Sequence, residues 1–300
     1  METVLRTEHL TKAFGNKTAV NDVSMTIEKG DIYGFIGKNG AGKTTLMRLV
    51  LNLIFPTSGT IELFGESKLT KSNLSRTGSL IEAPTLFGNC SAWENMKRFA
   101  ILYGATDDDI NAALSAVSLT DTGKKKASKF SFGMKQRLGI AIALLGNPDF
   151  IVLDEPVNGL DPEGIKEMRD LILRLNREKG TTFLISSHLL DELSKVVTKY
   201  GIIRDGVLVE EISATDLEKK CVHNLKIIVD NVDGAKALLS AEYGDDCVSV
   251  DDGAVVISGH NEKSAEINKK LFEGGFSVSG IETLSGDIES YFINMMGGEG

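Results

Sequence analysis

The chain of 300 residues is long enough for two domains. Its charge also differs between two parts. Residues 216–300 hold 7 Lys and 16 Asp or Glu, whereas residues 1–215 hold 26 basic and 26 acidic residues. An acidic C-terminal part argues against nucleic acid or an anionic lipid surface as its partner. Three cysteines without metal-ligand spacing, and no apolar run long enough to cross a bilayer, indicate a cytoplasmic protein with reduced thiols that would reach a membrane only through a partner.

The first elements along the chain are strands. Residues 1–36 alternate between apolar and polar, with a turn at "FGNK", and the apolar strand "DIYGFIG" leads directly into a glycine-rich loop. Residues 44–53 then have the pattern of a helix. A strand, a glycine-rich loop and a helix in this order are the context in which such a loop predicts phosphate binding.

The loop "GKNGAGKTT", residues 37–45, matches GxxxxGK(S/T) and is called the phosphate loop below. Its backbone amides can wrap a phosphate, its glycines allow close approach, Lys43 supplies a positive charge and Thr44 offers a hydroxyl to Mg²⁺. The chain lacks the Asn-Lys-x-Asp tetrad of proteins that read guanine. We therefore expect a nucleotide other than GTP, together with Mg²⁺, bound by Gly37, Lys38, Asn39, Gly40, Ala41, Gly42, Lys43, Thr44 and Thr45.

The pattern becomes helical between about residues 84 and 146. "SAWE" at 91–94 has the spacing of a capping box, "TDDD" at 106–109 is an acidic helix start, and Ser131 precedes a helical run that ends near Gly146. These residues predict a helical subdomain inserted between two segments of sheet.

Two further strands, "FIVLDEP" at 150–156 and "TTFLISSH" at 181–188, flank a helix and predict an α/β core with a largely parallel sheet. Asp154 and Glu155 end the first of these strands on the side of the phosphate loop. There Asp154 can hold Mg²⁺, and Glu155 can polarise a water aimed at the γ-phosphate.

The chain beyond residue 215 has the order strand, helix, strand, strand, helix, strand, which is typical of a ferredoxin-like unit. The sequence thus predicts an α/β P-loop domain at 1–215, with its helical subdomain at about 84–146. A small α+β accessory domain of ferredoxin-like βαββαβ order is expected at 216–300.

The run "SKFSFGMKQRLGIAIALLGNPDFIVLDEPVNGLD", residues 128–161, resembles the stretch from the signature motif to the D-loop of ATP-binding cassette (ABC) ATPases, and the resemblance extends over residues 1–215. The usual signature is Leu-Ser-Gly-Gly-Gln, from which Phe132 and Met134 depart. The resemblance implies that Ser131 and Gly133 contact the γ-phosphate held by the opposite subunit. A serine at a helix N-terminus is suited to bind an anion.

The same resemblance implies roles for three more residues. Phe14 would stack on adenine, although an isolated Phe in a strand is more often part of a core. Asp161 would be the D-loop acid that crosses a dimer interface, and His188 would be the switch histidine that senses the γ-phosphate and acts in catalysis with Glu155. Because the chain carries a single cassette, the resemblance implies that ATP as cofactor is sandwiched between two cassettes, either in a homodimer or in a dimer with a close relative.

Glu82, in "GSLIEAPTLFGN", stands where most ABC ATPases carry a glutamine that touches Mg²⁺. A carboxylate is a better ligand for a hard cation than an amide, so Glu82 is expected to complete a metal site with Thr44 and Asp154. A glutamate here, together with "FGMKQRL" and the acidic C-terminal part, is similar to the bacterial subfamily that exports peptide antibiotics, including lantibiotic and bacitracin-type transporters.

The resemblance implies an ATP-hydrolysing subunit on the cytoplasmic face of the cell membrane. It would drive export of an antibiotic peptide or lipid-like compound through a separate multi-span transmembrane permease. The alternative is a soluble ABC-type ATPase that acts as an assembly or regulatory clamp on a cytosolic partner. Co-purification with a membrane subunit or with a soluble protein would distinguish the two.

Overall fold

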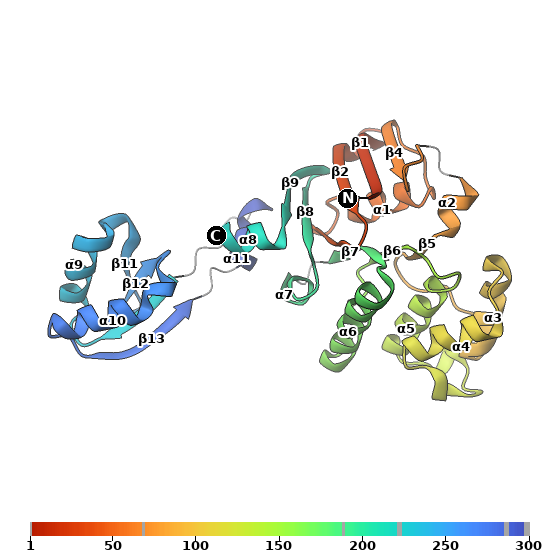
Figure 1. Cartoon of the computed structure of the whole chain (residues 1–300). Coiled ribbons are helices and arrows are strands. Elements are labelled where there is room, and N and C mark those ends of the chain that lie inside the picture. The colour runs from red at the N-terminus through yellow and green to blue at the C-terminus, as the bar shows by residue number, and fades with distance from the viewer. Residues whose placement is uncertain (1, 68–69, 188–189, 221–223, 285–287, 297–300) are drawn as a thin grey trace. The chain divides into compact units, whose positions relative to one another are not determined.

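The computed structural model describes residues 2–67, 70–187, 190–220, 224–284 and 288–296. The chain forms two compact units, the first comprising residues 1–214 and 295–300 and the second residues 215–294 (Figure 1). The change in charge near residue 215 thus lies beside the point where the chain leaves the first unit. No helix in these described ranges is both long enough and apolar enough to cross a membrane.

The first unit contains two sheets. The antiparallel sheet has the order β2 (Lys17–Glu28), β1 (Thr3–Phe14) and β4 (Ser58–Leu63). The second sheet has the order β5 (Thr77–Leu80), β6 (Phe150–Asp154), β7 (Thr182–Ser187), β3 (Ile32–Ile36), β8 (Lys199–Arg204) and β9 (Val207–Ser213). Strands β5, β6, β7, β3 and β8 run parallel, and β9 pairs antiparallel at the edge. The predicted α/β core with a largely parallel sheet is confirmed.

The central strands of the parallel sheet are mostly apolar, because both faces of the sheet are covered. Every residue of β3, β6 and β7 is buried. Helix α1 (Lys43–Val50) follows β3 and packs Leu46 and Leu49 into the same core as Phe35 and Val152. Since parallel strands end at one edge of a sheet, this arrangement brings the residues after β3, β6 and β7 together.

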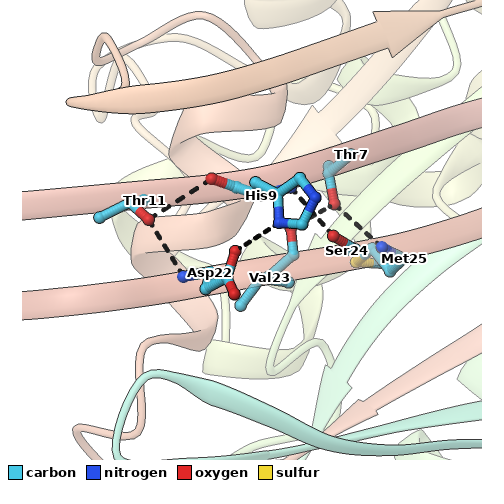
Figure 2. A network of polar contacts seen from close by, with 7 residues as sticks. All are labelled: Thr7, His9, Thr11, Asp22, Val23, Ser24 and Met25. Carbon is cyan, nitrogen blue, oxygen red and sulfur yellow. Dashed lines mark hydrogen bonds and ion pairs between the residues drawn. The ribbon is translucent and has the colours of Figure 1, made fainter.

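Strands β1 and β2 are joined by side chains where their ladder is irregular. The register shifts between Thr7 and Leu10, and His9 and Asp22 both adopt positive φ angles of 50° and 55°. The Thr11 hydroxyl accepts the Asp22 N–H at 3.0 Å, and His9 Nδ1 lies 2.7 Å from Asp22 Oδ1 (Figure 2). The contacts of His9 with Ser24 and Asp22 therefore link β1 to β2 at an exposed irregularity of their ladder.

The helical subdomain is built from α3 (Ala92–Tyr103), α4 (Asp107–Ala116) and α5 (Phe132–Ala143), which gather beside β5 in Figure 1. Two 3₁₀ helices, Thr120–Thr122 and Ala127–Lys129, link α4 to α5. Ser91 and Glu94 form a capping box, in which the Ser91 hydroxyl accepts the Glu94 N–H and the Glu94 carboxylate accepts the Ser91 N–H. Thr106 begins α4 in the same way, so both predicted helix starts are confirmed. The remaining helices of the unit are α2 (Lys71–Ser75), α6 (Pro162–Lys179) and α7 (Leu190–Ser194).

The second unit contains a four-stranded antiparallel sheet. Its strands are β10 (Asn224–Val229), β11 (Val248–Asp251), β12 (Ala254–Ser258) and β13 (Val278–Leu284), and their order is β11-β12-β10-β13. Helices α9 (Val232–Tyr243) and α10 (Ser264–Glu273) connect them, with 3₁₀ turns at Asp245–Cys247 and Asn261–Lys263. Read from the other edge and numbered within the unit, β13-β10-β12-β11 is the order 4-1-3-2. The predicted ferredoxin-like order of elements is therefore confirmed.

Two helices flank this sheet in sequence and were not predicted. They are α8 (Ala214–Lys220) and α11 (Ile288–Met295). Leu217 and Phe292 are fully buried, and Lys220 Nζ donates to the Tyr291 hydroxyl at 3.3 Å. Packing at single apolar positions stabilises these short helices, and such isolated positions give no periodic signal in the sequence.

Candidate functional site

The phosphate loop connects β3 to α1, and close backbone approach dictates its glycines. Gly42 has a φ of 111°, and a Cβ there would lie 2.3 Å from the Ala19 carbonyl oxygen. A Cβ at Gly37 would lie 2.5 Å from the Ile203 carbonyl oxygen. Only glycine fits both positions without movement of the backbone. The loop leads into the N-terminus of α1, which begins at Lys43, and the free N–H groups of a helix N-terminus favour an anion.

Lys43 is held over the loop by main-chain oxygens. Its side chain is buried, and Nζ donates to the Gly37 carbonyl at 2.6 Å and to the Lys38 carbonyl at 3.4 Å. The same ammonium lies 3.4 Å from Glu155 Oε1. These contacts fix a positive charge inside the curve of the loop, where a phosphate would meet it.

Asp154 connects three elements at the carboxyl edge of the parallel sheet. Thr44 on α1 donates its hydroxyl to Asp154 Oδ2 at 2.8 Å. Ser186 on β7 donates its hydroxyl to Asp154 Oδ1 at 2.5 Å. A hydroxyl and a carboxylate are oxygen ligands of the kind that Mg²⁺ takes together with substrate phosphates and water. The residues at this point therefore fit Mg²⁺.

Glu155 follows Asp154 in a left-handed backbone conformation with a φ of 51°. Its N–H donates to the Ser186 hydroxyl at 2.9 Å and also points to the Ser186 carbonyl at 3.2 Å. A non-glycine residue in this region costs about 1–2 kcal/mol, which these two hydrogen bonds offset. The turn at Glu155 places its carboxylate beside Lys43, at the mouth of the phosphate loop.

Glu82 also has a left-handed backbone, with a φ of 61°. Its carboxylate Oε1 lies 2.6 Å from Arg48 Nη2, and 63% of its side chain is exposed. Among the described contacts, Glu82 touches neither Thr44 nor Asp154. The expected metal role of Glu82 therefore stays a prediction, and its partner here is a cation on α1.

Phe14 ends β1 with an exposed ring. The residue is 52% exposed, and Lys12 Nζ lies 4.9 Å from the ring centroid. Phe14 is thus not part of the core, which was the alternative for an isolated Phe in a strand. An exposed aromatic face beside a cation is suited to stack on a base.

Ser131, Gly133 and Asp161 meet at a second place in the first unit. Ser131 caps α5 by accepting the Met134 N–H at 3.2 Å, and Asp161 caps α6 by accepting the Gly164 N–H at 2.9 Å. They line a single cleft, whose lining within the described chain includes no residue of the phosphate loop. The departure at Phe132 is accommodated at Gly159, where a Cβ would lie 3.1 Å from the Phe132 ring.

Another cleft touches the phosphate loop itself. Residues 38–41 line it together with residues 203–205 and Met296. Arg204 Nη1 donates to the Met295 carbonyl at 3.0 Å. Thr45, the last residue of the phosphate loop, lies in the first turn of α1. His188, the expected switch histidine, lies outside the described residues.

Three polar residues near the site were missed in the sequence. They are Ser186, Arg48 and Gln136. Gln136 is buried on α5, and its side-chain amide donates to the Pro156 carbonyl at 3.5 Å. This hydrogen bond connects α5 to the segment that follows β6. Ser186 directly follows the apolar run of residues 183–185, and a polar residue at that place was the available signal, whereas Gln136, between Lys135 and Arg137, gave none.

Comparison with known proteins identifies the family. Residues 20–158 match the family described as ABC transporter. The bacitracin transport ATP-binding protein BcrA of Bacillus licheniformis is 42% identical over 302 residues, which cover 99% of each chain. The chain belongs to the ABC transporter family.

Other ABC proteins match about two thirds of the chain, or its fold alone. The lantibiotic transport ATP-binding protein SrtF of Streptococcus pyogenes is 42% identical over 208 residues, covering 69% of this chain and 90% of that protein. The structure of cbiO1 from Clostridium perfringens, part of the ABC transporter complex cbiONQ, aligns with a TM-score of 0.66 at 24% identity and covers 72% of this chain and 91% of that one. This last similarity shows the fold alone.

These comparisons confirm four predictions: the family, the P-loop ABC fold, ATP binding and ATP hydrolysis. The chain is the ATP-hydrolysing subunit of an ABC transporter. The alternative of a soluble clamp on a cytosolic partner is not favoured, because the relatives are transport ATP-binding proteins.

Proposed function

We propose that this ABC ATPase drives export of a peptide antibiotic, or of a lipid-like compound, through a separate multi-span permease. The subunit would be bound to the cytoplasmic face of the membrane by that permease. The observation that carries the proposal is the extent of similarity to BcrA, which covers 99% of this chain. The similarity therefore includes the second unit, residues 215–294, which we call the accessory unit. The lantibiotic relative covers 69% of the chain, which favours a bacitracin-type cargo over a lantibiotic.

In the proposed mechanism, the phosphate loop and Lys43 bind the β- and γ-phosphates of ATP. Thr44 and Asp154 would hold Mg²⁺, which would supply charge neutralisation on the phosphate oxygens. Glu155 orients the attacking water by accepting a hydrogen bond from it. The Glu155 carboxylate lies 3.4 Å from Lys43 Nζ, the group assigned to the γ-phosphate. This closeness supports a role for Glu155 next to the γ-phosphate.

The ATP site is completed by a second copy of the chain. We assign Ser131 and Gly133 to the γ-phosphate bound by the partner, Asp161 to the dimer interface, and His188 to γ-phosphate sensing. The cleft that Ser131, Gly133 and Asp161 share supports this arrangement, since the phosphate loop contributes nothing to it. Phe14, exposed at the end of β1, is assigned to the adenine ring.

Glu82 is assigned to coupling between nucleotide and permease. Its ion pair with Arg48 neutralises the charge that a glutamate adds near the triphosphate. A bound Mg²⁺ would compete with Arg48 for this carboxylate. The exposed pair is worth only about 0.2–1 kcal/mol, so a divalent cation can displace Arg48 readily.

The proposal is tested by isolating the membrane protein that co-purifies with this subunit and co-expressing the two in a host sensitive to bacitracin. Resistance should rise with the parental pair and stay at the level of the host with Glu155→Gln, which should bind ATP without hydrolysing it. Active ATPase without any gain in resistance, or a soluble protein in place of a permease in pull-downs, would overturn the export proposal.

A further inference from the structure

Ser186 lies in the interior of the first unit and contacts both carboxylate residues of the proposed site. It is fully buried on β7. Its hydroxyl donates to Asp154 Oδ1 at 2.5 Å and accepts the Glu155 N–H at 2.9 Å. A serine hydroxyl has one donor and two acceptor positions, so the donor is used on Asp154 and the acceptor on Glu155.

The sheet explains why one hydroxyl reaches both residues. Asp154 and Ser186 are partners in the parallel register of β6 and β7, so their side chains leave the same face of the sheet side by side. The chain then turns at Glu155 with positive φ, which brings the Glu155 N–H back toward Ser186.

We propose that Ser186 is a positioning residue for ATP hydrolysis. Its hydroxyl fixes the Asp154 carboxylate so that Oδ2 faces Thr44, and it holds the backbone turn that aims Glu155. The inference rests on the metal role assigned to Asp154 and the water-orienting role assigned to Glu155. It adds that the geometry of both depends on a single hydroxyl from a neighbouring strand.

The contacts predict which function Ser186 controls most. Each oxygen of the Asp154 carboxylate accepts one hydroxyl, and an O–H to carboxylate hydrogen bond is of the strong, charge-assisted kind. The Glu155 N–H has a second acceptor in the Ser186 carbonyl at 3.2 Å, which remains in any substitution of the side chain. Loss of the hydroxyl should therefore weaken Mg²⁺ binding more than it disturbs the turn at Glu155.

The test uses the purified full-length protein and its Ser186→Ala variant. Residues that orient metal ligands typically cost 10–100-fold in metal affinity or activity when removed. We expect Ser186→Ala to raise the Mg²⁺ concentration for half-maximal ATPase by roughly that factor. Binding of trinitrophenyl-ATP in EDTA, which reports the phosphate loop alone, should be unchanged. At the Mg²⁺ concentrations that enhance this binding in the parental protein, Ser186→Ala should show no enhancement. This readout does not depend on turnover.

A matched control is available on the same strand. Thr182 is also fully buried on β7, and its hydroxyl accepts the Gly30 N–H at 3.0 Å, at the end of the strand opposite to Ser186. Thr182→Val removes a buried hydroxyl without contact to Asp154, so it should lower Tm by a few degrees and leave the Mg²⁺ dependence at the parental value. Ser186→Thr keeps the hydroxyl and should restore most of the Mg²⁺ affinity that Ser186→Ala loses.

The outcomes separate this inference from the function on which it rests. Parental Mg²⁺ dependence in Ser186→Ala, with only the fall in Tm seen in Thr182→Val, would overturn the inference. Asp154→Asn run beside it tests the metal role itself. If Asp154→Asn shifts the Mg²⁺ dependence and Ser186→Ala does not, only the positioning role fails. If neither variant shifts it, the metal role of Asp154 fails and the inference fails with it.

Discussion

Gly42→Ala should damage both the stability and the nucleotide site of this ABC ATPase. Gly42 combines a φ of 111° with a carbonyl oxygen, that of Ala19, 2.3 Å from the position of an added Cβ. Gly40 is the natural comparison, because it has a φ of 83° and nothing within 4 Å of an added Cβ. Gly40→Ala therefore measures the backbone strain alone, and Gly42→Ala measures strain plus overlap.

The structure gives the size of each effect. A side chain in a backbone region that favours glycine costs about 1–3 kcal/mol. Overlap with a backbone oxygen that must move costs about 1–3 kcal/mol more, as in an overpacked core. In a domain of this size, 1 kcal/mol lowers Tm by about 2–4 °C. We expect the Tm of Gly42→Ala to lie about 2–12 °C below that of Gly40→Ala.

The assay is thermal unfolding of the two variants and the parental protein, followed by ATP titration well below each Tm. Gly42 is the N-terminal cap of α1, so moving it displaces Lys43 and Thr44 and should weaken ATP binding at least tenfold. Equal Tm values for the two variants, or parental ATP affinity in Gly42→Ala, would refute the argument that the Ala19 carbonyl dictates this glycine.

Three further changes test other parts of the protein. Glu82→Gln should leave ATP affinity and Tm nearly unchanged, because its pair with Arg48 is exposed, but should alter hydrolysis or transport; parental rates in both assays would contradict its coupling role. Phe14→Ala should weaken ATP binding roughly 5- to 150-fold, from a base-stacking energy of about 1–3 kcal/mol, and an unchanged affinity measured by titration would exclude stacking. The hydrogen bond from the Ser91 N–H, together with Lys126, holds the pKa of the Glu94 carboxyl below its ordinary value of 4.5. The charged carboxylate therefore stabilises the fold above pH 4.5, and this stabilisation is lost as the pH falls through the lowered pKa. Glu94→Gln should therefore flatten the fall of Tm below about pH 4.5, and the parental slope in that variant would be evidence against the capping box as its source.

Local signals in the sequence predicted much of the fold. Strand β6 is apolar up to its last residue, Asp154, and the helix starts at Ser91 and Thr106 carry both halves of a capping box. The helix after the phosphate loop was predicted at 44–53, whereas α1 spans Lys43–Val50. Asn52 adopts a positive φ of 56°, which ends the helix despite the apolar residues that follow. Local chemistry therefore identified the elements better than it identified their ends.

The site was predictable where a motif fixes the spacing and unpredictable where partners come from distant strands. Thr44 and Asp154 were both proposed for the metal, and they lie in contact. The pair of Glu82 with Arg48 was missed, because it joins a loop to a helix that precedes it by 34 positions. Ser186 was missed for a related reason: its role depends on the register of β6 against β7, which no short motif encodes.

The first unit is discontinuous in sequence, since it contains residues 1–214 and resumes at residue 295. The described residues Met295 and Met296, which follow the accessory unit in the chain, thus belong to the first unit. A truncation after residue 214 would delete the Met295 carbonyl that Arg204 contacts, together with Met296 beside residues 38–41. Experiments that ask what the accessory unit does should splice residue 214 to residue 295 through a short linker. Altered ATP binding in a simple truncation would report the loss of that returning segment as well as the loss of the unit.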